Sequence, residues 1–349
     1  MEMVLAYLYK NFKSIHIIAP NIKMGGGLEL LLYLYEYVYI NYKQYNFIFY
    51  IDKSLENKII CKKNIDVVVL NSKVSKIKLF SKKFSNALYF GNLPPLVKSK
   101  NSLVYFHNLY LLENYKELLR TSLKFFLKYS LQQIYIKYFI KNLDFVAVQN
   151  NIIKNNFIKK YNFDKVKILP FFRLCEKNKY KDISKIYDFC YISLGYPHKN
   201  HIKLLKACEI LSNLNYKFSI AMTIEKEYFK LIDMIKSINS KNNIKIINLG
   251  KITKNEVNLV YAKSKCLVFP SIKETFGLSL IEASHMGLDI IASDLEYVYE
   301  VVNPSMVFDP FSSDDIARCI ANYLKGNIKR SNGIITNKID DLINILIKE

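Results

Sequence analysis

Residues 266–302 read CLVFPSIKETFGLSLIEASHMGLDIIASDLEYVYEVV, and this stretch indicates the fold class. The apolar run Cys266–Pro270 predicts a buried strand, and the polar residues Ser271–Thr275 predict a turn. A helix is expected over Gly277–His285 and a second strand over Asp289–Ser293. A strand, a helix and a strand in this order predict an α/β fold with a parallel sheet.

Two carboxylates lie on either side of the start of this helix. Glu274 precedes the helix and Glu282 lies about two turns inside it, so the pair can contact opposite ends of one extended ligand. Between them, the first N–H groups of the helix lack intrahelical acceptors and carry the positive end of the helix dipole. Gly277 leaves room for a ligand to approach the backbone. The stretch therefore predicts a site for a phosphate-bearing ligand.

The spacing of these acids resembles a known signature. A bare E-x7-E pattern is weak because Glu is common on helices, but here VFPS precedes it and FGL lies inside it. Ala283, Gly287, the strand IIASD and Glu300-Val301-Val302 follow it. As a unit, the stretch resembles the donor-site signature of the family 4 retaining glycosyltransferases, the glycosyl transferases group 1.

This resemblance implies a fold and a set of contacts. The expected fold is α/β of the GT-B class, with two Rossmann-like, doubly wound parallel-sheet domains that face each other across a cleft. The resemblance implies that the second domain holds most of a nucleoside-diphosphate sugar. Glu274 would contact hydroxyls of the transferred sugar, Glu282 would contact the ribose, and the amides of Phe276, Gly277 and Leu278 would lie near the sugar and the diphosphate. The plain alternative for Glu282 is a solvated helix residue.

The length of 349 residues favours two domains of about 150 to 180 residues each. We expect an acceptor-side domain over residues 1–175 and a sugar-nucleotide domain over residues 186–330. The hydrophilic segment Glu176–Lys185 reads as the linker between them. Residues 331–349 include a helical pattern at Ile339–Ile347, for which one option is a helix that packs back onto the first domain.

The first domain begins with a strand over Lys13–Ala19, the loop NIKMGGG and a helix over Leu28–Ile40. Gly26-Gly27-Leu28-Glu29 resembles the GG-x-E tract of family 4 enzymes, where this loop faces the donor phosphates and the acceptor. The alternative is a glycine turn that only closes the unit. Asp52 ends the next strand, about where the ribose-binding acid of a nicotinamide site lies, but Leu30 occupies the third glycine position, so G-x-G-x-x-G is not met.

His107 is a further candidate because it follows the strand Leu103–Phe106 at the carboxyl end, where open α/β sheets bind ligands. The resemblance implies that His107 contacts the donor sugar. The alternative is a capping or core histidine, with Asn108 as the helix cap. Arg173, near the expected domain boundary, is a further candidate for the cleft.

Lys199 is the cationic candidate of the second domain. Family 4 enzymes typically show Gly-Arg-Leu after the first strand of this domain and a Lys five residues after the Arg, and both side chains neutralise the diphosphate. Lys199 in the segment HKN matches that Lys, whereas the Arg is missing: the neighbouring residues are Ile192, Ser193, Leu194, Gly195 and Tyr196. One Lys beside a helix start still places positive charge where a leaving diphosphate gains negative charge. The alternative is an ordinary surface residue.

The net charge of +21 is concentrated in the first half of the chain. Residues 1–170 carry 26 Lys and Arg against 10 Asp and Glu, and residues 171–349 carry 25 against 20. Residues 113–142 predict one long helix or two joined ones, rich in aromatic residues, in which Lys116, Arg120, Lys124 and Lys128 recur every four residues. This pattern fits an anionic membrane surface or, equally, a solvated face of a core helix. Nucleic acid is not expected as a partner, since no reader motif accompanies the charge.

The remaining composition argues against metal and disulfide sites. The six cysteines are scattered without C-x-x-C pairs, and no Asp-x-Asp pair lies near the expected donor site, so no metal or other cofactor is expected. The apolar start of the chain precedes Lys10 and lacks a cleavage site, and Leu28–Ile40 is too short to span a bilayer. We therefore expect a cytoplasmic protein, with peripheral contact to the inner face of the membrane as an option.

The sequence as a whole predicts a retaining glycosyltransferase of the hexosyltransferase type. It would move a sugar from a nucleoside-diphosphate sugar to a glycan or lipid-linked glycan acceptor, in the assembly of a bacterial surface polysaccharide such as lipopolysaccharide. Glu274, Lys199 and His107 are the catalytic candidates. Three alternatives stay open: another two-domain sugar-nucleotide enzyme such as an epimerase, an inactive partner subunit, and a basic nucleic-acid binder.

Overall fold

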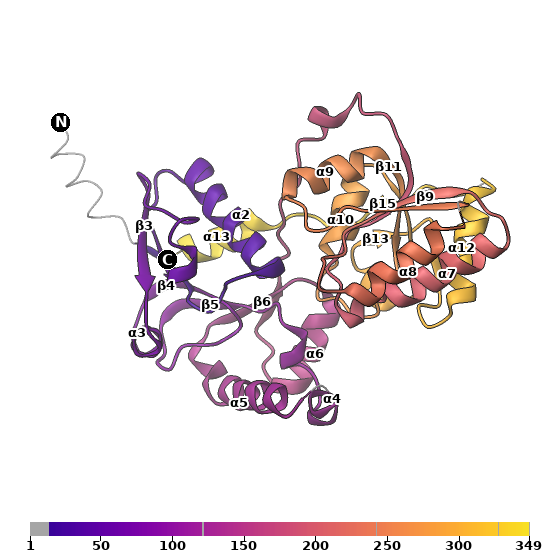
Figure 1. Cartoon of the computed structure of the whole chain (residues 1–349). Helices are drawn as coiled ribbons and strands as arrows, with labels where there is room; N and C mark the ends of the chain where they lie inside the picture. Colours follow the sequence, from indigo (N-terminus) through magenta and orange to yellow (C-terminus); the bar gives the residue numbers. More distant parts are fainter. Residues whose placement is uncertain (1–13, 121, 242, 327, 349) are drawn as a thin grey trace. The chain divides into compact units, whose positions relative to one another are not determined.

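The structure, a computed structural model, describes residues 14–120, 122–241, 243–326 and 328–348 as two compact α/β units (Figure 1). The first domain comprises the described residues up to Arg173 together with those from Thr336 onward, and the second domain comprises Leu174–Ile335. The apolar start of the chain, considered above as a leader, lies outside the described residues.

Within its described residues, the first domain contains a parallel sheet in the order β3-β2-β1-β4-β5-β6-β7. The strands are β1 (Ile15–Ala19), β2 (Phe47–Asp52), β3 (Ile65–Leu70), β4 (Ser85–Phe90), β5 (Lys100–Tyr105), β6 (Phe145–Val148) and β7 (Val166–Ile168). The helices are α2 (Gly25–Asn41), α3 (Lys73–Phe80), α4 (Tyr115–Leu119), α5 (Leu123–Phe139), α6 (Asn151–Tyr161) and α13 (Ile339–Ile347). The strand order reverses between β1 and β4, so the carboxyl ends of these two strands form a natural ligand position.

The second domain has the same type of sheet, in the order β10-β9-β8-β11-β12-β14 among its described residues. Its strands are β8 (Tyr187–Tyr191), β9 (Phe218–Met222), β10 (Ile244–Asn248), β11 (Ser264–Phe269), β12 (Asp289–Ser293) and β14 (Met306–Phe308), and β13 (Val302–Asn303) pairs with β15 (Asn332–Gly333). Its helices are α7 (His201–Asn213), α8 (Phe229–Asn239), α9 (Lys254–Lys263), α10 (Leu278–His285), α11 (Glu296–Tyr299) and α12 (Ser313–Leu324). The strand order reverses between β8 and β11, which are the strands before Lys199 and Glu274.

Short 3-10 turns complete the described elements: η1 (Lys53–Leu55), η2 (Leu109–Leu111), η3 (Ile140–Asn142), η4 (Lys177–Tyr180) and η5 (Pro197–Lys199). The turn η4 lies inside the hydrophilic segment 176–185, just after the division between the two units.

The helix α13 is part of the first domain although it follows the second domain in sequence. Its Ile339, Leu342, Ile343 and Leu346 are buried in one core with residues of α2. The Lys338 N–H donates to the Pro170 carbonyl over 2.7 Å, and the hydroxyls of Tyr37 and Tyr42 each donate to Asp340 Oδ1 over 2.8 Å. These contacts anchor the C-terminal helix at both its core side and its polar side.

The strand 289–293 and the helix 339–347 are confirmed with the predicted bounds. One detail was wrong. The helix α2 begins at Gly25, so the glycine tract forms its first turn and is not a loop. The segment 113–142 contains two helices, which is one of the two forms that its pattern allowed, because the Ser122 hydroxyl accepts the Phe125 N–H and starts α5 anew. The predicted basic stripe is therefore divided between α4 and α5.

Candidate active site

Lys199 and Glu274 form an ion pair at the switch point of the second sheet. Lys199 ends η5 after β8, and Glu274 lies in the loop after the neighbouring strand β11. Their Nζ and Oε1 atoms are 2.6 Å apart, and the two side chains are 19% and 12% exposed. The sequence predicted both residues as donor contacts, whereas their contact with each other emerges only from the fold.

Backbone hydrogen bonds fix the two loops against each other. The Ile272 N–H and the Ser271 hydroxyl both donate to the His198 carbonyl, over 2.9 and 3.2 Å. The Tyr191 hydroxyl donates to the Lys199 carbonyl over 2.6 Å. Asn200, at a φ of +61°, donates from Nδ2 to the carbonyls of Pro270 and Pro310. These hydrogen bonds fix the two loops that carry Lys199 and Glu274, so that both charges are preorganised.

The start of α10 lies directly after this pair. Gly277 has a φ of +73° and precedes the first helical residue, Leu278. A side chain at 277 would be strained at this φ and would place its Cβ 3.1 Å from Leu280 Cδ1. Phe276 buries its ring in the core, so its contribution to a ligand would come from its backbone. The Ser279 hydroxyl donates to the Ile192 carbonyl over 3.3 Å and ties this helix start to the end of β8.

Glu282, the fifth residue of α10, forms an ion pair with Lys254 on α9. Sequence reasoning missed Lys254. A signal was available: Thr253 and Glu256 form a capping box, in which the Thr253 N–H donates to Glu256 Oε2 over 2.6 Å. That box predicts Lys254 as the first helical residue.

In the first domain, Gly27 and His107 line a common pocket of about 360 Å³ at the carboxyl ends of β1, β4 and β5. A Cβ at Gly27 would lie 2.9 Å from His107 Nε2, so the imidazole occupies the space that the glycine leaves. The Asn92 Oδ1 accepts the His107 N–H over 2.7 Å. The Asn108 side chain caps η2 by accepting the Tyr110 N–H, which is the capping role predicted for it above. Gly26 is exposed in the first turn of α2.

Burial lowers the pKa of His107 to about 4, so its imidazole is neutral near pH 7. A neutral imidazole can donate or accept a hydrogen bond but adds no positive charge. His107 is therefore suited to a sugar hydroxyl and not to charge neutralisation.

Two other residues considered from the sequence have local partners. Asp52 pairs with Lys23 and Lys76, and these lysines together with Ser54 hold the pKa of its carboxyl low despite burial, which acts in the opposite direction. Arg173 donates to Glu36 Oε2 over 2.6 Å and lies over the Tyr33 ring. The structure thus explains Asp52 and Arg173 by contacts within the first domain.

Among the described residues, no helix is both long enough and apolar enough to cross a bilayer. Over the same residues, no group of three or more His, Cys, Asp or Glu side chains is arranged as a metal site.

Comparison with known proteins gives a family match for the second domain. Residues 176–340 match the family model described as glycosyl transferases group 1. The O-antigen chain mannosyltransferase RfbU of Salmonella typhimurium is 26% identical over 213 residues, which is 59% of this chain and 60% of that relative. The match thus spans less than two thirds of the relative's own length.

Solved structures share the fold across nearly the whole chain. A glycosyltransferase from Rickettsia africae ESF-5 has a TM-score of 0.66 at 17% identity, over 97% of this chain and 93% of that one. Anabaena Alr3699/HepE, solved with UDP and glucose, has a TM-score of 0.60 at 13% identity, over 90% of each chain. The family match and the shared fold confirm the resemblance predicted from residues 266–302: the second domain is a glycosyl transferases group 1 domain, in a chain with the GT-B class of fold.

Proposed function

We propose that this chain is a retaining glycosyltransferase that moves a sugar from a nucleoside-diphosphate sugar to a glycan or lipid-linked glycan acceptor, in bacterial surface polysaccharide assembly. The observation that carries the proposal is the Lys199–Glu274 pair, held at the switch point of the second sheet beside the start of α10. The family match and the similarity to an O-antigen chain mannosyltransferase support the same activity.

In this proposal, the bond between the sugar C1 and the diphosphate oxygen breaks while the acceptor oxygen bonds to C1 on the same face. The departing diphosphate oxygen takes the proton of the acceptor hydroxyl. Lys199 and the amides at Gly277 and Leu278 stabilise the charge that grows on the diphosphate. Glu274 binds hydroxyls of the sugar and, before the donor arrives, holds the Lys199 ammonium in position. In the first domain, His107, as a neutral imidazole, forms a hydrogen bond to a hydroxyl of the donor sugar, and Gly27 leaves the space for its ring.

The experiment that tests this proposal has two steps. Thermal-shift screening of the purified chain against sugar nucleotides identifies the donor, and product analysis follows with and without a glycan acceptor. A glycosylated product that forms only with acceptor supports the proposal. An altered sugar formed without acceptor indicates an epimerase, and no binding of any sugar nucleotide indicates an inactive partner subunit.

Glu282→Gln is expected to weaken donor binding by about 10-fold or more, because a charge-assisted hydrogen bond to the ribose contributes about 1.5 to 3 kcal/mol. Isothermal titration calorimetry with the identified donor measures the change. Lys254→Met, which removes the ion-pair partner of Glu282, is the matched comparison and should weaken binding less. Equal affinities for the wild-type chain and Glu282→Gln would contradict the ribose contact.

Transfer is expected to proceed at an unchanged rate after EDTA treatment, because in this proposal Lys199 and the helix start supply the positive charge that a divalent ion supplies elsewhere. Initial rates before and after chelation, with Mg²⁺ or Mn²⁺ added back, measure this. A loss of activity that either ion restores would contradict the prediction.

The acceptor side of the proposal includes a membrane surface, which one face of α5 favours. Its exposed apolar residues fall within about 80° of the helix circumference: Leu123, Leu127, Leu131, Ile134 and Tyr138. Lys124 and Lys128 flank this stripe on one side and Lys137 on the other, and all three are exposed. The opposite face packs into the core through Tyr129 and Ile136. An apolar stripe between lysines fits an anionic bilayer at the cytoplasmic face.

Leu127→Glu is expected to lower binding to phosphatidylserine-containing vesicles by about 10-fold or more, since burying one Leu contributes about 1.5 to 3 kcal/mol. Flotation measures the bound fraction. Ile77→Glu on α3, where the side chain is 62% exposed against 51% for Leu127, is the control and should bind normally. Equal flotation of the two variants would contradict the assignment of this face.

A further inference from the structure

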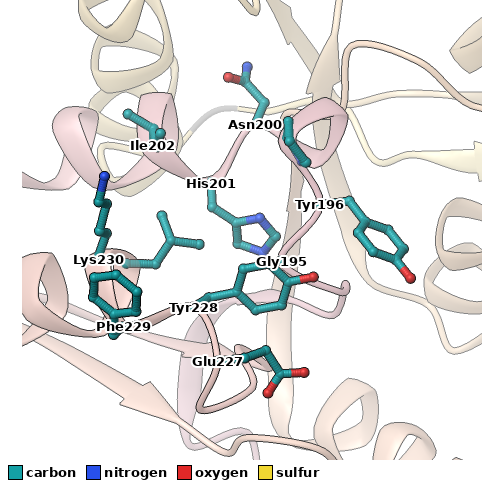
Figure 2. A pocket seen from close by; sticks show the side chains of 11 residues that line it. Gly195, Tyr196, Asn200, His201, Ile202, Glu227, Tyr228, Phe229 and Lys230 are labelled. Carbon is teal, nitrogen blue, oxygen red and sulfur yellow. The ribbon is translucent and has the colours of Figure 1, made fainter. Parts of the chain in front are cut away.

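A second pocket of the second domain lies outside the donor contacts. It has a volume of about 490 Å³ and is formed by the segment after β8, the start of α7 and the start of α8 (Figure 2). Its lining residues are Gly195, Tyr196, Pro197, Asn200, His201, Ile202 and Glu227 to Leu231. Lys199, Glu274 and Glu282 are not among them. We call this hollow the α7–α8 pocket.

Its most unusual member is His201, the first residue of α7. His201 is 2% exposed, and neither of its ring nitrogens has a hydrogen-bond partner among the described residues. Burial lowers the pKa of His201 to about 3, so the ring is neutral near pH 7 and offers one donor and one acceptor. Figure 2 shows the ring between the side chains of the two walls. A buried polar group without a partner destabilises the fold, and a ligand that supplied the partner would remove this penalty.

The walls of the pocket define the rest of the ligand. Tyr196, Tyr228 and Phe229 supply aromatic rings, and Ile202 and Pro197 add apolar surface. The volume lies in the range of pockets for small molecules, which combine apolar walls with a few polar groups. Glu227 and Lys230, both exposed and of opposite sign, give the pocket no net charge. These features favour a neutral, flat, ring-sized molecule.

Gly195 shapes one wall of the pocket. A Cβ at this position would lie 2.4 Å from Cδ2 of Tyr228, so the tyrosine ring packs directly on the glycine backbone. The ring of Tyr191 packs against that of His201 at a tilt of 40°, with centroids 4.8 Å apart. The imidazole thus contacts Tyr191 in addition to lining the pocket.

We propose that the α7–α8 pocket binds a small neutral heteroaromatic ring, with His201 as its hydrogen-bonding anchor and the three aromatic side chains as its walls. The site is separate from the donor contacts and does not depend on the proposed glycosyl transfer. The ligand class is that of nucleobase-like heterocycles, which are flat, uncharged and carry hydrogen-bonding atoms on their edge.

The test is NMR of the full chain with isotope-labelled histidine, since the chain has only five histidines. The probes are adenine, uracil and benzimidazole, and benzene serves as the apolar control. We expect at least one of the three heterocycles to shift the ring signals of His201 in a saturable manner, while those of His16 and His107 stay unchanged. If none of the three shifts the His201 signals, the proposal is wrong.

Two variants separate an anchored site from a plain apolar cavity. His201→Phe keeps a ring of similar size without nitrogens and should raise the dissociation constant of the heterocycle, measured by calorimetry, about 10-fold, as expected for one lost hydrogen bond. Phe229→Ser, at an exposed position on the rim, should also weaken binding while leaving the fold intact. Unchanged affinity in His201→Phe, or equal binding of benzene, overturns the role of the imidazole.

A third variant separates this proposal from the proposed function. Lys199→Met should lose glycosyl transfer but keep heterocycle binding, because Lys199 does not line the pocket. If the heterocycle binding disappears together with the transfer activity, the pocket is part of the donor site and the proposal of a separate site is wrong.

Discussion

Lys199→Met is expected to lower kcat about 10²- to 10³-fold, because it removes the full positive charge that faces the leaving diphosphate. Stabilising groups aimed at charge that develops in the transition state typically contribute this much. The effect should fall on kcat more than on KM, since the charge on the leaving group is largest in the transition state. Methionine keeps the length of the side chain, so the loops around η5 should stay in place.

Initial rates with the identified donor and acceptor measure this effect, and a thermal melt checks that the variant is folded. Lys206→Met, at an exposed position on the same helix that follows Lys199, is the matched control and should keep its activity. Turnover of Lys199→Met within a few fold of the wild type would show that another group stabilises the leaving charge.

Glu274→Gln should lower kcat/KM by about 10- to 150-fold, because a carboxylate that accepts hydrogen bonds from sugar hydroxyls contributes about 1.5 to 3 kcal/mol. It also leaves the Lys199 ammonium, 19% exposed, without its partner at 2.6 Å. The two effects can be separated by combining the substitutions. Since the side chains contact each other, the double variant Lys199→Met, Glu274→Gln should lose less than the product of the two single losses.

The control for this cycle is Glu209→Gln, an exposed acid on α7 that should leave activity unchanged. Strictly multiplicative losses in the double variant would mean that the ion pair does not couple the two residues during the reaction. Normal activity of Glu274→Gln would remove the sugar contact from the mechanism.

The sequence predicted the elements that follow simple apolar runs and missed details set by single polar residues. The strand 289–293 and the helix 339–347 have the predicted bounds, because their apolar patterns end abruptly at polar or glycine residues. The first turn of α2 was missed because glycine disfavours helices, although the first turn has no intrahelical N–H bonds to lose. The position of the break at Ser122 was not predicted, although two joined helices were one of the alternatives, because the apolar pattern continues through it.

In the candidate site, too, local motifs could be predicted whereas contacts between distant segments could not. Glu274, Glu282 and Lys199 could be named from their local motifs, but their ion pairs join segments far apart in the sequence and depend on the strand order. Lys254 was within reach of prediction through its capping box. His201 was not, because a single histidine after Asn200 has no periodic or motif signal, and its significance comes only from burial without a partner.

The position of α13 has a consequence for synthesis on the ribosome. The core of the first domain includes Ile339, Leu342 and Leu346, so that domain lacks part of its interior until α13 has emerged. The second domain, Leu174–Ile335, is then complete before the first. We expect a nascent chain stalled before residue 336 to expose the apolar surface of α2 and to need chaperone protection there, whereas its second domain should already resist protease.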